Sequence, residues 1–434
     1  MKFIKLRALL LVQLLMAVAS TPVMLNDDAG WCWYQDERAI WSDGKLIAGS
    51  VSDGKGRIAR RGNIEINSLD LATGAVSHFI LHPRLERDDH DAPSLLELPD
   101  GRILAVYSGH GIDSAVRSRV TLRPGDITAW SDEVVFTPPD REPTSYTHLF
   151  RLADENGRIY NFYRGKGWDP NVMSSDDEGK TWAYTGQVAT GPGRPYIKYA
   201  SDNRDTVHFI LTDQHPRDFD NSLYHGYLRG GKLFDSFGKQ VGDLQHPPEP
   251  NAYTVIFKGR PDGVAWGSDI NLDAEGRPFV TYSVQIDGAG KPRGTGGKDH
   301  RYRYAYFDGA WQDHEVAYAG TRIYAGEDDY TGLICLAPWA LDTVYFSTNS
   351  DPKSGAPLIS AADGKRHWEL FKATTRDGGA TWKFEEVTKD STQDNIRPNA
   401  PIGGPAGGAL LWLRGHMKAY HNYRLEMVVQ VPAP

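Results

Sequence analysis

The sequence predicts an all-β fold, a single seven-bladed β-propeller, because a turn-and-strand pattern recurs at a regular distance and a second hairpin motif occurs twice. The recurring turn has Asp, Asn or Glu followed by Gly-Arg, and the next strand carries Tyr six positions beyond the Gly. Its glycines, Gly101, Gly157 and Gly276, are 56 and 119 positions apart, which is one period and two periods of about 58 residues. Residues 20–434 hold about seven such periods, each long enough for a four-stranded blade with generous loops.

The second motif fits the pattern S/T-x-D-x-G-x-T-W and occurs at 175–182 and 375–382. It is the Asp-box, a hairpin turn in which the Asp and Ser/Thr side chains hold the loop backbone while the Trp packs between strands. The two Asp-boxes resemble those of sialidase-like propellers, in which they are structural. A weaker echo, Asp-Thr-Val-x-Phe, pairs 205–209 with 342–346. A β-sandwich joined to a smaller module is the alternative fold.

Composition and charge restrict the class of protein. Of the 434 residues, 40% are hydrophobic and 24% are charged, which is ordinary for a globular protein and excludes a disordered or fibrous one. The net charge of −8 becomes −11 when the first 19 residues are removed, which argues against general nucleic-acid binding. The two cysteines, Cys32 and Cys335, cannot form a disulfide scaffold, and two separately buried thiols are favoured over a bond between them.

Residues 1–19 have the pattern of a secretory signal peptide. A basic start is followed by the apolar run 8–16 and by Ala17-Val18-Ala19, a small-x-small cleavage site. The run is too short to span a bilayer, and no later segment has 18 consecutive apolar residues. We therefore predict a secreted or periplasmic protein without a membrane span, monomeric, whose residues 20–434 form one propeller domain. An uncleaved anchor is the alternative.

The first group of candidate functional residues surrounds two histidines. His90 and His110 are 20 positions apart and flank the turn at 100–101, so neighbouring strands can direct both imidazoles into one cavity. A hydrogen-bonded surface histidine is the alternative for each. The acidic residues around His90, in Asp88-Asp89-His90-Asp91, could hold a structural Ca²⁺ through oxygen ligands or form a solvated turn.

A second group lies around Arg164. Strict alternation in an extended segment would put Thr144, Tyr146 and His148 on one face. Arg164 follows at the end of a predicted strand, where its guanidinium can bind a carboxylate in a bidentate manner. A salt bridge at the rim of the propeller is the alternative. Polar and aromatic residues further along suit sugar contacts, although loop structure also explains them. They are Arg194, Tyr196, His215 and Tyr224.

This mixture of histidine, tyrosine and arginine fits β-elimination from a uronate. That reaction removes the C5 proton beside a carboxylate, so the site must neutralise the carboxylate and stabilise an enolate-like charge. It also needs a base for the proton and an acid for the leaving oxygen, which Tyr or His can supply. Glycosidases usually need two facing carboxylates, and the candidates include no such pair.

The sequence resembles the BNR-repeat family, which includes seven-bladed propeller ulvan lyases and rhamnosyl-glucuronate lyases. The likeness extends over most of the chain after the leader and is densest between residues 30 and 225. Five segments carry it: Gly30–Ile40, Asp89–Pro93, Tyr107–Gly111, Phe162–Gly165 and Arg194–Tyr196.

The resemblance implies elimination at a glucuronate or iduronate next to rhamnose. In those lyases two histidines about twenty residues apart, a tyrosine and an arginine form the site. His90 and His110 match the histidine pair, and Arg164 matches the arginine that neutralises the carboxylate. The family spacing places the catalytic tyrosine at His148, so either Tyr146 fills that role, His148 replaces it, or activity is altered.

Three functions are compared at this point. The first is a polysaccharide or oligosaccharide lyase that acts on an acidic polymer of rhamnose and uronate and requires no cofactor. The second is a sialidase-like or rhamnosidase-like glycoside hydrolase on the same fold, and the third is a sugar-binding propeller without catalysis. The lyase is preferred because a sialidase would need an arginine triad that Arg164 and Arg194 leave incomplete.

Overall fold

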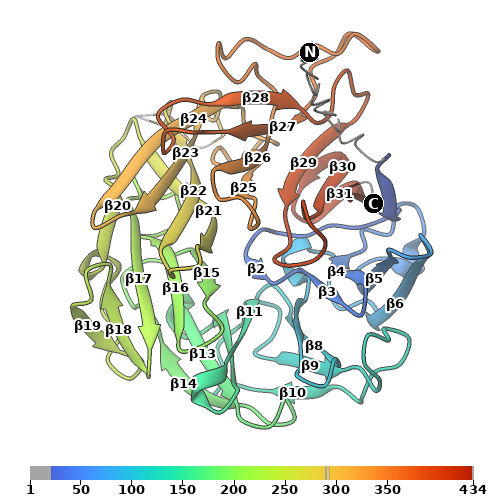
Figure 1. The fold of residues 1–434 in the computed structure, drawn as a ribbon, viewed down its shortest axis with the longest axis vertical. Coiled ribbons are helices and arrows are strands. Elements are labelled where there is room, and N and C mark those ends of the chain that lie inside the picture. Colours follow the sequence, from blue (N-terminus) through green and yellow to red (C-terminus); the bar gives the residue numbers. More distant parts are fainter. Residues whose placement is uncertain (1–20, 289–290, 293, 433–434) are drawn as a thin grey trace, which may run out of the picture.

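The computed structural model describes residues 21–288, 291–292 and 294–432, and the predicted signal peptide lies outside them. Seven sheets surround a central axis (Figure 1), which confirms the predicted seven-bladed propeller. Blades 1 to 3 are β3–β6 (Ala39–Ser42, Lys45–Val51, Ile64–Asp70, Val76–His82), β7–β10 (Ser94–Glu97, Ile103–Ser108, Val116–Val120, Val134–Phe136) and β11–β14 (Ser145–Leu152, Arg158–Arg164, Pro170–Ser175, Ala183–Gln187).

Blades 4 to 6 continue in chain order. They are β15–β19 (Ile197–Ser201, Thr206–Thr212, Leu223–Arg229, Lys232–Asp235, Gln240–Asp243), β21–β24 (Val264–Leu272, Pro278–Gln285, His300–Phe307, Trp311–Gly320) and β25–β28 (Ile334–Leu336, Thr343–Thr348, Glu369–Thr374, Lys383–Glu386). Two short strands extend the pattern: β2 (Gln35–Asp36) pairs parallel with β11, and β20 (Thr254–Phe257) pairs with β17. The described helices are all single 3₁₀ turns: η1 (Ile58–Arg60), η2 (Asp89–Asp91), η3 (Ala153–Glu155), η4 (Lys166–Trp168) and η5 (Pro250–Ala252).

The seventh blade closes the ring with strands from both ends of the described chain. It combines β29–β31 (Asp394–Asn399, Leu410–Ala419, Asn422–Gln430) with β1 (Val23–Asn26), which pairs antiparallel with β31. Figure 1 shows this junction, where blue and red segments meet. The strand nearest the amino terminus of the described chain thus completes the last blade and joins the two ends of the ring.

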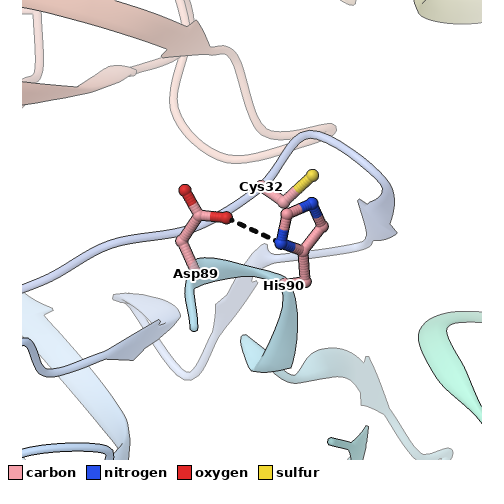
Figure 2. A group of neighbouring side chains, drawn as sticks. All are labelled: Cys32, Asp89 and His90. Atoms are coloured by element: carbon pink, nitrogen blue, oxygen red, sulfur yellow. Dashed lines mark ion pairs between the residues drawn. The ribbon is translucent and has the colours of Figure 1, made fainter. Parts of the chain in front are cut away.

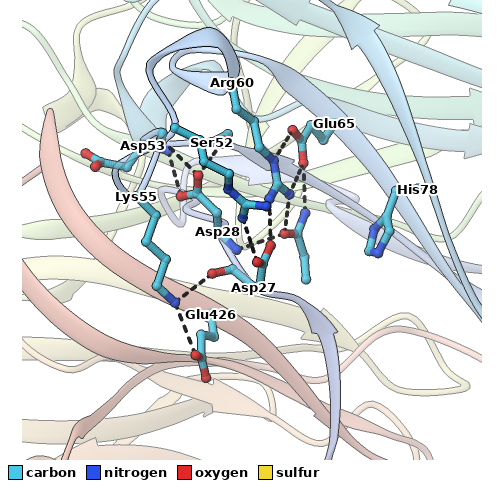
Figure 3. A network of polar contacts seen from close by, with 12 residues as sticks. Asp27, Asp28, Ser52, Asp53, Lys55, Arg60, Glu65, His78 and Glu426 are labelled. Carbon is cyan, nitrogen blue, oxygen red and sulfur yellow. Dashed lines mark hydrogen bonds and ion pairs between the residues drawn. The ribbon is translucent and has the colours of Figure 1, made fainter.

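A polar network fastens the closing strand to blade 1 (Figure 3). Arg60 donates to Glu65 on β5 at 2.8 Å and to Asp27, which follows β1, at 2.6 Å. Lys55 reaches Glu426 on β31 at 3.1 Å. Because Glu65 is only 3% exposed, its charge needs these partners, and the network ties residues from both ends of the described chain together.

The sequence repeats occupy equivalent places in different blades. The Gly101, Gly157 and Gly276 turns join the first and second strands of blades 2, 3 and 5, and all three glycines have φ between 75° and 81°. The repeated tyrosines after them are buried: Tyr107, Tyr163 and Tyr282. The Asp-boxes join the third and fourth strands of blades 3 and 6. The repeating unit found in the sequence therefore corresponds to one blade.

The core lies between neighbouring blades as a series of hydrophobic clusters. Cys32 and Cys335 are both buried and free, so the interpretation as two separate thiols is confirmed. Within the described residues, no helix is long and apolar enough to cross a membrane.

Alternating strands give the propeller two faces with different roles. We call the face where first strands begin and second strands end the site face. The Gly-Arg turns lie on the opposite face. The site face collects the segment around η2, the start of β11, the end of β12 and the turn between β30 and β31.

Candidate active site

His90 and His110 lie side by side on the site face. Their imidazole rings stack with centroids 4.0 Å apart and 13° between the ring planes. Asp88 holds both rings, because its Oδ1 lies 2.5 Å from Nδ1 of His90 and its Oδ2 lies 3.0 Å from Nδ1 of His110. Asp88 also caps η2 by accepting a hydrogen bond from the backbone N–H of His90. The structure thus brings together the two histidines that the spacing predicted as partners.

The two imidazoles carry different charges. Nη2 of Arg164 lies 3.0 Å from Nε2 of His110, and an arginine can only donate, so that imidazole nitrogen accepts and Nδ1–H faces Asp88. Burial and the neighbouring His90 lower the pKa of His110 to about 4, which keeps it neutral. Burial alone would lower the pKa of His90 as well, yet Cys32 and the carboxylates beside it raise that pKa well above its ordinary value.

Arg164 ends β12 as a buried cation without an anionic partner. Its side chain donates to three neutral acceptors: Nε2 of His110, the hydroxyl of Tyr196 at 3.2 Å and Oγ of Ser145 at 3.3 Å. Within the described part of the chain, Arg164 makes no ion pair, and its Nε has no hydrogen-bond partner. The guanidinium lies over the rings of Tyr146 and Trp168, at 4.6 and 4.9 Å. A buried guanidinium with neutral neighbours is suited to bind a carboxylate that arrives with a ligand.

Tyr146 reaches this group because the strand that carries it is irregular. Its φ is 61°, and the pairing of β11 with β12 shifts register between Ser145 and His148. The ring lies 5.5 Å from that of His90 and 5.9 Å from that of His110. Its hydroxyl is buried and has no hydrogen-bond partner among the described residues. Burial raises the pKa of Tyr146 well above its ordinary value, while Arg164 opposes the rise.

His148 belongs to a different cluster. Its Nδ1 lies 3.1 Å from Oδ2 of Asp36, and that carboxylate also accepts from Nζ of Lys198 at 2.7 Å. The ring packs against Tyr199 at 4.8 Å. The expected strict alternation from Thr144 through His148 is therefore wrong, because the irregularity at Tyr146 breaks it. Tyr146, rather than His148, contacts the histidine pair, while His148 and Arg164 line one small cavity with Tyr146.

The residues predicted to bind sugar separate into two groups. Tyr196 receives a hydrogen bond from Arg164, and the ring of His215 packs edge-on against Tyr196 at 5.1 Å, so both adjoin the site. Arg194 is 3.5 Å from Asp218 on the loop after β16. Tyr224 lies in the hydrophobic cluster of blades 3 and 4 and donates to Asp213 at 2.8 Å, so the structure does not bring it to Arg164.

Sequence reasoning missed several residues of the site. Tyr420 lies in the turn between β30 and β31 and points its ring edge-on toward both imidazoles, at 5.2 and 5.8 Å. It is 310 positions from His110, and no local motif marks it. Ser145 and Trp168, which contact Arg164, were also not singled out, although both lie within 20 positions of it. Only ring closure places Tyr420 at the histidine pair.

Two groups of side chains in the described chain could hold a metal ion, and both include His90. One is Asp88, His90 and His110, and the other, drawn in Figure 2, is Cys32, Asp89 and His90. Nitrogen and sulfur donors suit transition metals, whereas Ca²⁺ prefers oxygen ligands throughout. Asp89 is also bound to Arg397 at 2.6 Å, so part of its charge is already neutralised. The structural calcium ion stays a prediction.

A comparison with family models matches residues 53–319, more than half of the chain, to the BNR repeat-containing family. The chain belongs to that family. The match begins in blade 1 and ends at the last strand of blade 5, so it includes His90, His110, Tyr146 and Arg164. A comparison of the sequence with curated proteins found no match.

Solved structures share the fold of this BNR-repeat chain at low sequence identity. A polysaccharide lyase of family PL25, an ulvan lyase bound to a glucuronate–rhamnose 3-sulfate chain, has 16% identity and a TM-score of 0.69, with 94% of this chain and 95% of that chain covered. The polysaccharide lyase Uly1 has 10% identity and a TM-score of 0.60, with 95% and 99% covered. At these identities the likeness shows the propeller fold.

Proposed function

We propose that this protein is a secreted polysaccharide lyase that cleaves its substrate at a uronate by β-elimination. The observation that carries the proposal is Arg164, a buried guanidinium whose hydrogen-bond acceptors are all neutral. A uronate carboxylate would supply the missing anion. The ulvan lyase that shares the fold and binds a glucuronate–rhamnose chain supports the same class of substrate.

The reaction assigns a role to each residue of the site. Arg164 binds the uronate carboxylate in a bidentate manner and stabilises the negative charge that develops when C5 loses its proton. The Tyr146 phenolate takes that proton, and the phenol so formed donates it to the leaving glycosidic oxygen. The C4–O bond breaks, a C4–C5 double bond forms, and no water is consumed. The charge of Arg164, 4.6 Å from the Tyr146 ring, favours the phenolate that takes the proton.

The histidines serve as positioning and polar groups in this scheme. Neutral His110 accepts from Arg164 and holds the guanidinium in place, while Asp88 fixes the orientation of both imidazoles. His90, kept charged by its acidic neighbours, adds positive potential beside the carboxylate. The linkage proposed is the one between rhamnose and glucuronate or iduronate, as the family resemblance implies.

The hydrolase alternative has less support from the geometry. A glycosidase needs two carboxyl groups flanking the scissile bond. Here Asp88 is bound by two histidines, and Asp89 is bound by Arg397, so neither carboxylate is free to face a sugar. Arg194, which would join Arg164 in a sialidase triad, is paired with Asp218.

The deciding experiment follows ultraviolet absorbance of a 4,5-unsaturated uronate while the purified protein acts on ulvan and on a gum capped with rhamnose–glucuronate. A rise with either substrate, lost in Arg164→Ala, supports the lyase. Release of reducing sugar without a rise would favour the hydrolase. Sugar binding without any product would favour a non-catalytic propeller.

Export is proposed separately. Expression of residues 1–434 in a bacterial host, followed by amino-terminal sequencing of the protein in the periplasm or medium, should give a chain that begins at Ser20. A cytoplasmic chain that retains residues 1–19 would overturn this assignment.

A further inference from the structure

Trp168 is an exposed aromatic residue on the site face, beside the guanidinium of Arg164. It ends η4, the 3₁₀ turn that follows β12, and it is 41% exposed. The guanidinium carbon of Arg164 lies 4.9 Å from the centre of the indole. Tryptophan side chains are largely buried on average, so an exposed indole beside a carboxylate-binding group is a candidate for ligand contact.

The backbone holds Trp168 in a conformation that costs free energy. Its φ is 62°, and the preceding Gly167 has φ 70°, so two consecutive residues are left-handed. A bulky side chain adopts that region only where the surrounding contacts impose it. Here the Glu142 carboxylate accepts a hydrogen bond from the N–H of Gly167 at 2.7 Å, and the N–H of Trp168 donates to the carbonyl of Gly165 at 2.8 Å. These contacts fix where the indole lies.

A glycine on the neighbouring blade leaves room for the edge of the indole. A Cβ added at Gly111, in the loop after β8 of blade 2, would lie 3.4 Å from Cη2 of Trp168. Gly111 directly follows His110 in the sequence. The indole is therefore supported by the loop of blade 3 that carries it and by the histidine loop of blade 2, as a platform for a ligand requires.

The geometry leaves the indole for a sugar next to the uronate. A carboxylate bound in a bidentate manner lies in the plane of the guanidinium, and the C5 proton must point to the oxygen of Tyr146. Tyr146 is only 6% exposed, and its ring lies 5.5 and 5.9 Å from the two imidazoles. The uronate therefore occupies the side of Arg164 toward the histidine pair, and the exposed indole remains for the adjoining ring.

We propose that Trp168 is a stacking platform for the sugar residue adjoining the uronate, and that it strengthens the binding of an oligosaccharide but not of a single uronate. The apolar C–H face of a pyranose packs on the indole, while the hydroxyl groups at its edge stay in water. The inference rests on the proposed function for its choice of polymer. It deepens that function by naming a residue that recognises the polymer beside the reacting unit.

The test compares the KM of a glucuronate–rhamnose oligosaccharide with the inhibition constant of free glucuronate. In Trp168→Ala we expect KM to rise about tenfold, the effect of losing one stacked ring, while kcat stays within about threefold. Trp168→Tyr keeps an aromatic face and should stay within about threefold of the native KM, whereas Trp168→Leu should resemble Trp168→Ala. The inhibition constant of glucuronate, which depends on Arg164, should be unchanged in all three variants.

Trp339→Ala is the matched control. It removes a tryptophan of similar exposure, 36%, from the loop between β25 and β26 on the opposite face, and it should change neither constant. The thermal unfolding temperature of each variant shows whether the fold is kept. If Trp168→Ala does not fold, the comparison of Trp168→Tyr with Trp168→Leu decides in its place.

Two results would overturn the platform. Inhibition by glucuronate that weakens in proportion to the rise in KM would mean that the indole acts only through Arg164. Lyase activity with an unchanged KM in Trp168→Ala would overturn the platform and leave the lyase standing. Calorimetric titration with the oligosaccharide gives the opposite separation, because binding that Trp168→Ala weakens, without any unsaturated product from the native protein, would support the platform and overturn the lyase.

Discussion

Nη2 of Arg164 and Nε2 of His110 lie 3.0 Å apart, and this contact fixes the protonation of both residues. Since the arginine must donate, the imidazole must present a lone pair, and its remaining proton is on Nδ1 toward Asp88. A neutral histidine leaves the positive charge of Arg164 uncompensated. The carboxylate-binding character of the site therefore depends on keeping His110 neutral.

Arg164→Lys should reduce turnover of a uronate-containing chain by about 10²–10³-fold, because a lysine keeps the charge but loses the two-pronged geometry. The measurement is the rate of formation of the unsaturated uronate. Arg194→Lys, which changes an arginine already paired with Asp218, is the matched control and should change the rate less than about threefold. Equal losses in the two variants would contradict the role given to Arg164.

Tyr146→Phe should lower kcat by at least about 10²-fold with little change in folding, because only a hydroxyl without a partner is removed. His148→Gln should act mainly on stability, because it disturbs the buried cluster with Asp36 and Lys198. The thermal unfolding temperature and kcat of both variants test whether Tyr146 acts in catalysis and His148 in stability. If His148→Gln lost activity at unchanged stability while Tyr146→Phe stayed active, the proton-transfer role would pass to His148.

The charge states of the histidine pair predict a stability maximum near neutral pH. The pKa of His110 is lowered to about 4 in the fold, so the unfolded chain binds the extra proton between pH 4 and 6.5, and stability falls as pH falls through that window. This contribution is at most about 3 kcal/mol. The pKa of His90 is raised, so its contribution is present below about pH 6.5 and is lost at higher pH.

Nitrogen NMR of the imidazole rings checks these states directly. At pH 6.5 His110 should be neutral with its proton on Nδ1, and His90 should be charged. In denaturant unfolding at different pH values, the free energy of unfolding of His110→Asn should fall less steeply with decreasing pH than that of the native chain. A His110 ring that titrates near pH 6.5 would contradict the assignment.

Arg60→Met should destabilise the protein by about 2–4 kcal/mol, because it leaves the buried Glu65 carboxylate without its cation and cuts the link to Asp27. Arg57→Met is the control, since Arg57 binds the same Asp27 at 2.6 Å but is 54% exposed. Its loss should cost less than about 1 kcal/mol. Comparable losses in chemical denaturation would mean that the network does not hold the ring closed.

Prediction from sequence worked best where a local pattern repeats. The Gly-Arg turns and the Asp-boxes allowed the blade to be predicted as the repeating unit, because each copy meets the same packing requirement within its own sheet. The pairing of His90 with His110 was predictable for the same reason, since both residues flank one hairpin of blade 2. Tyr146 could not be separated from His148, because the register shift in β11 depends on how that strand meets β12.

The amino-acid sequence by itself determined the all-β class, the number of blades and the residue types that suit a uronate. Tertiary structure alone decided that Asp88 bridges the two imidazoles, that Tyr420 reaches them from the last blade, and that Arg164 has only neutral partners. The physical reason is that periodicity encodes contacts within a blade, whereas the site forms where different blades converge, and the partners of a buried charge are fixed only when the ring closes.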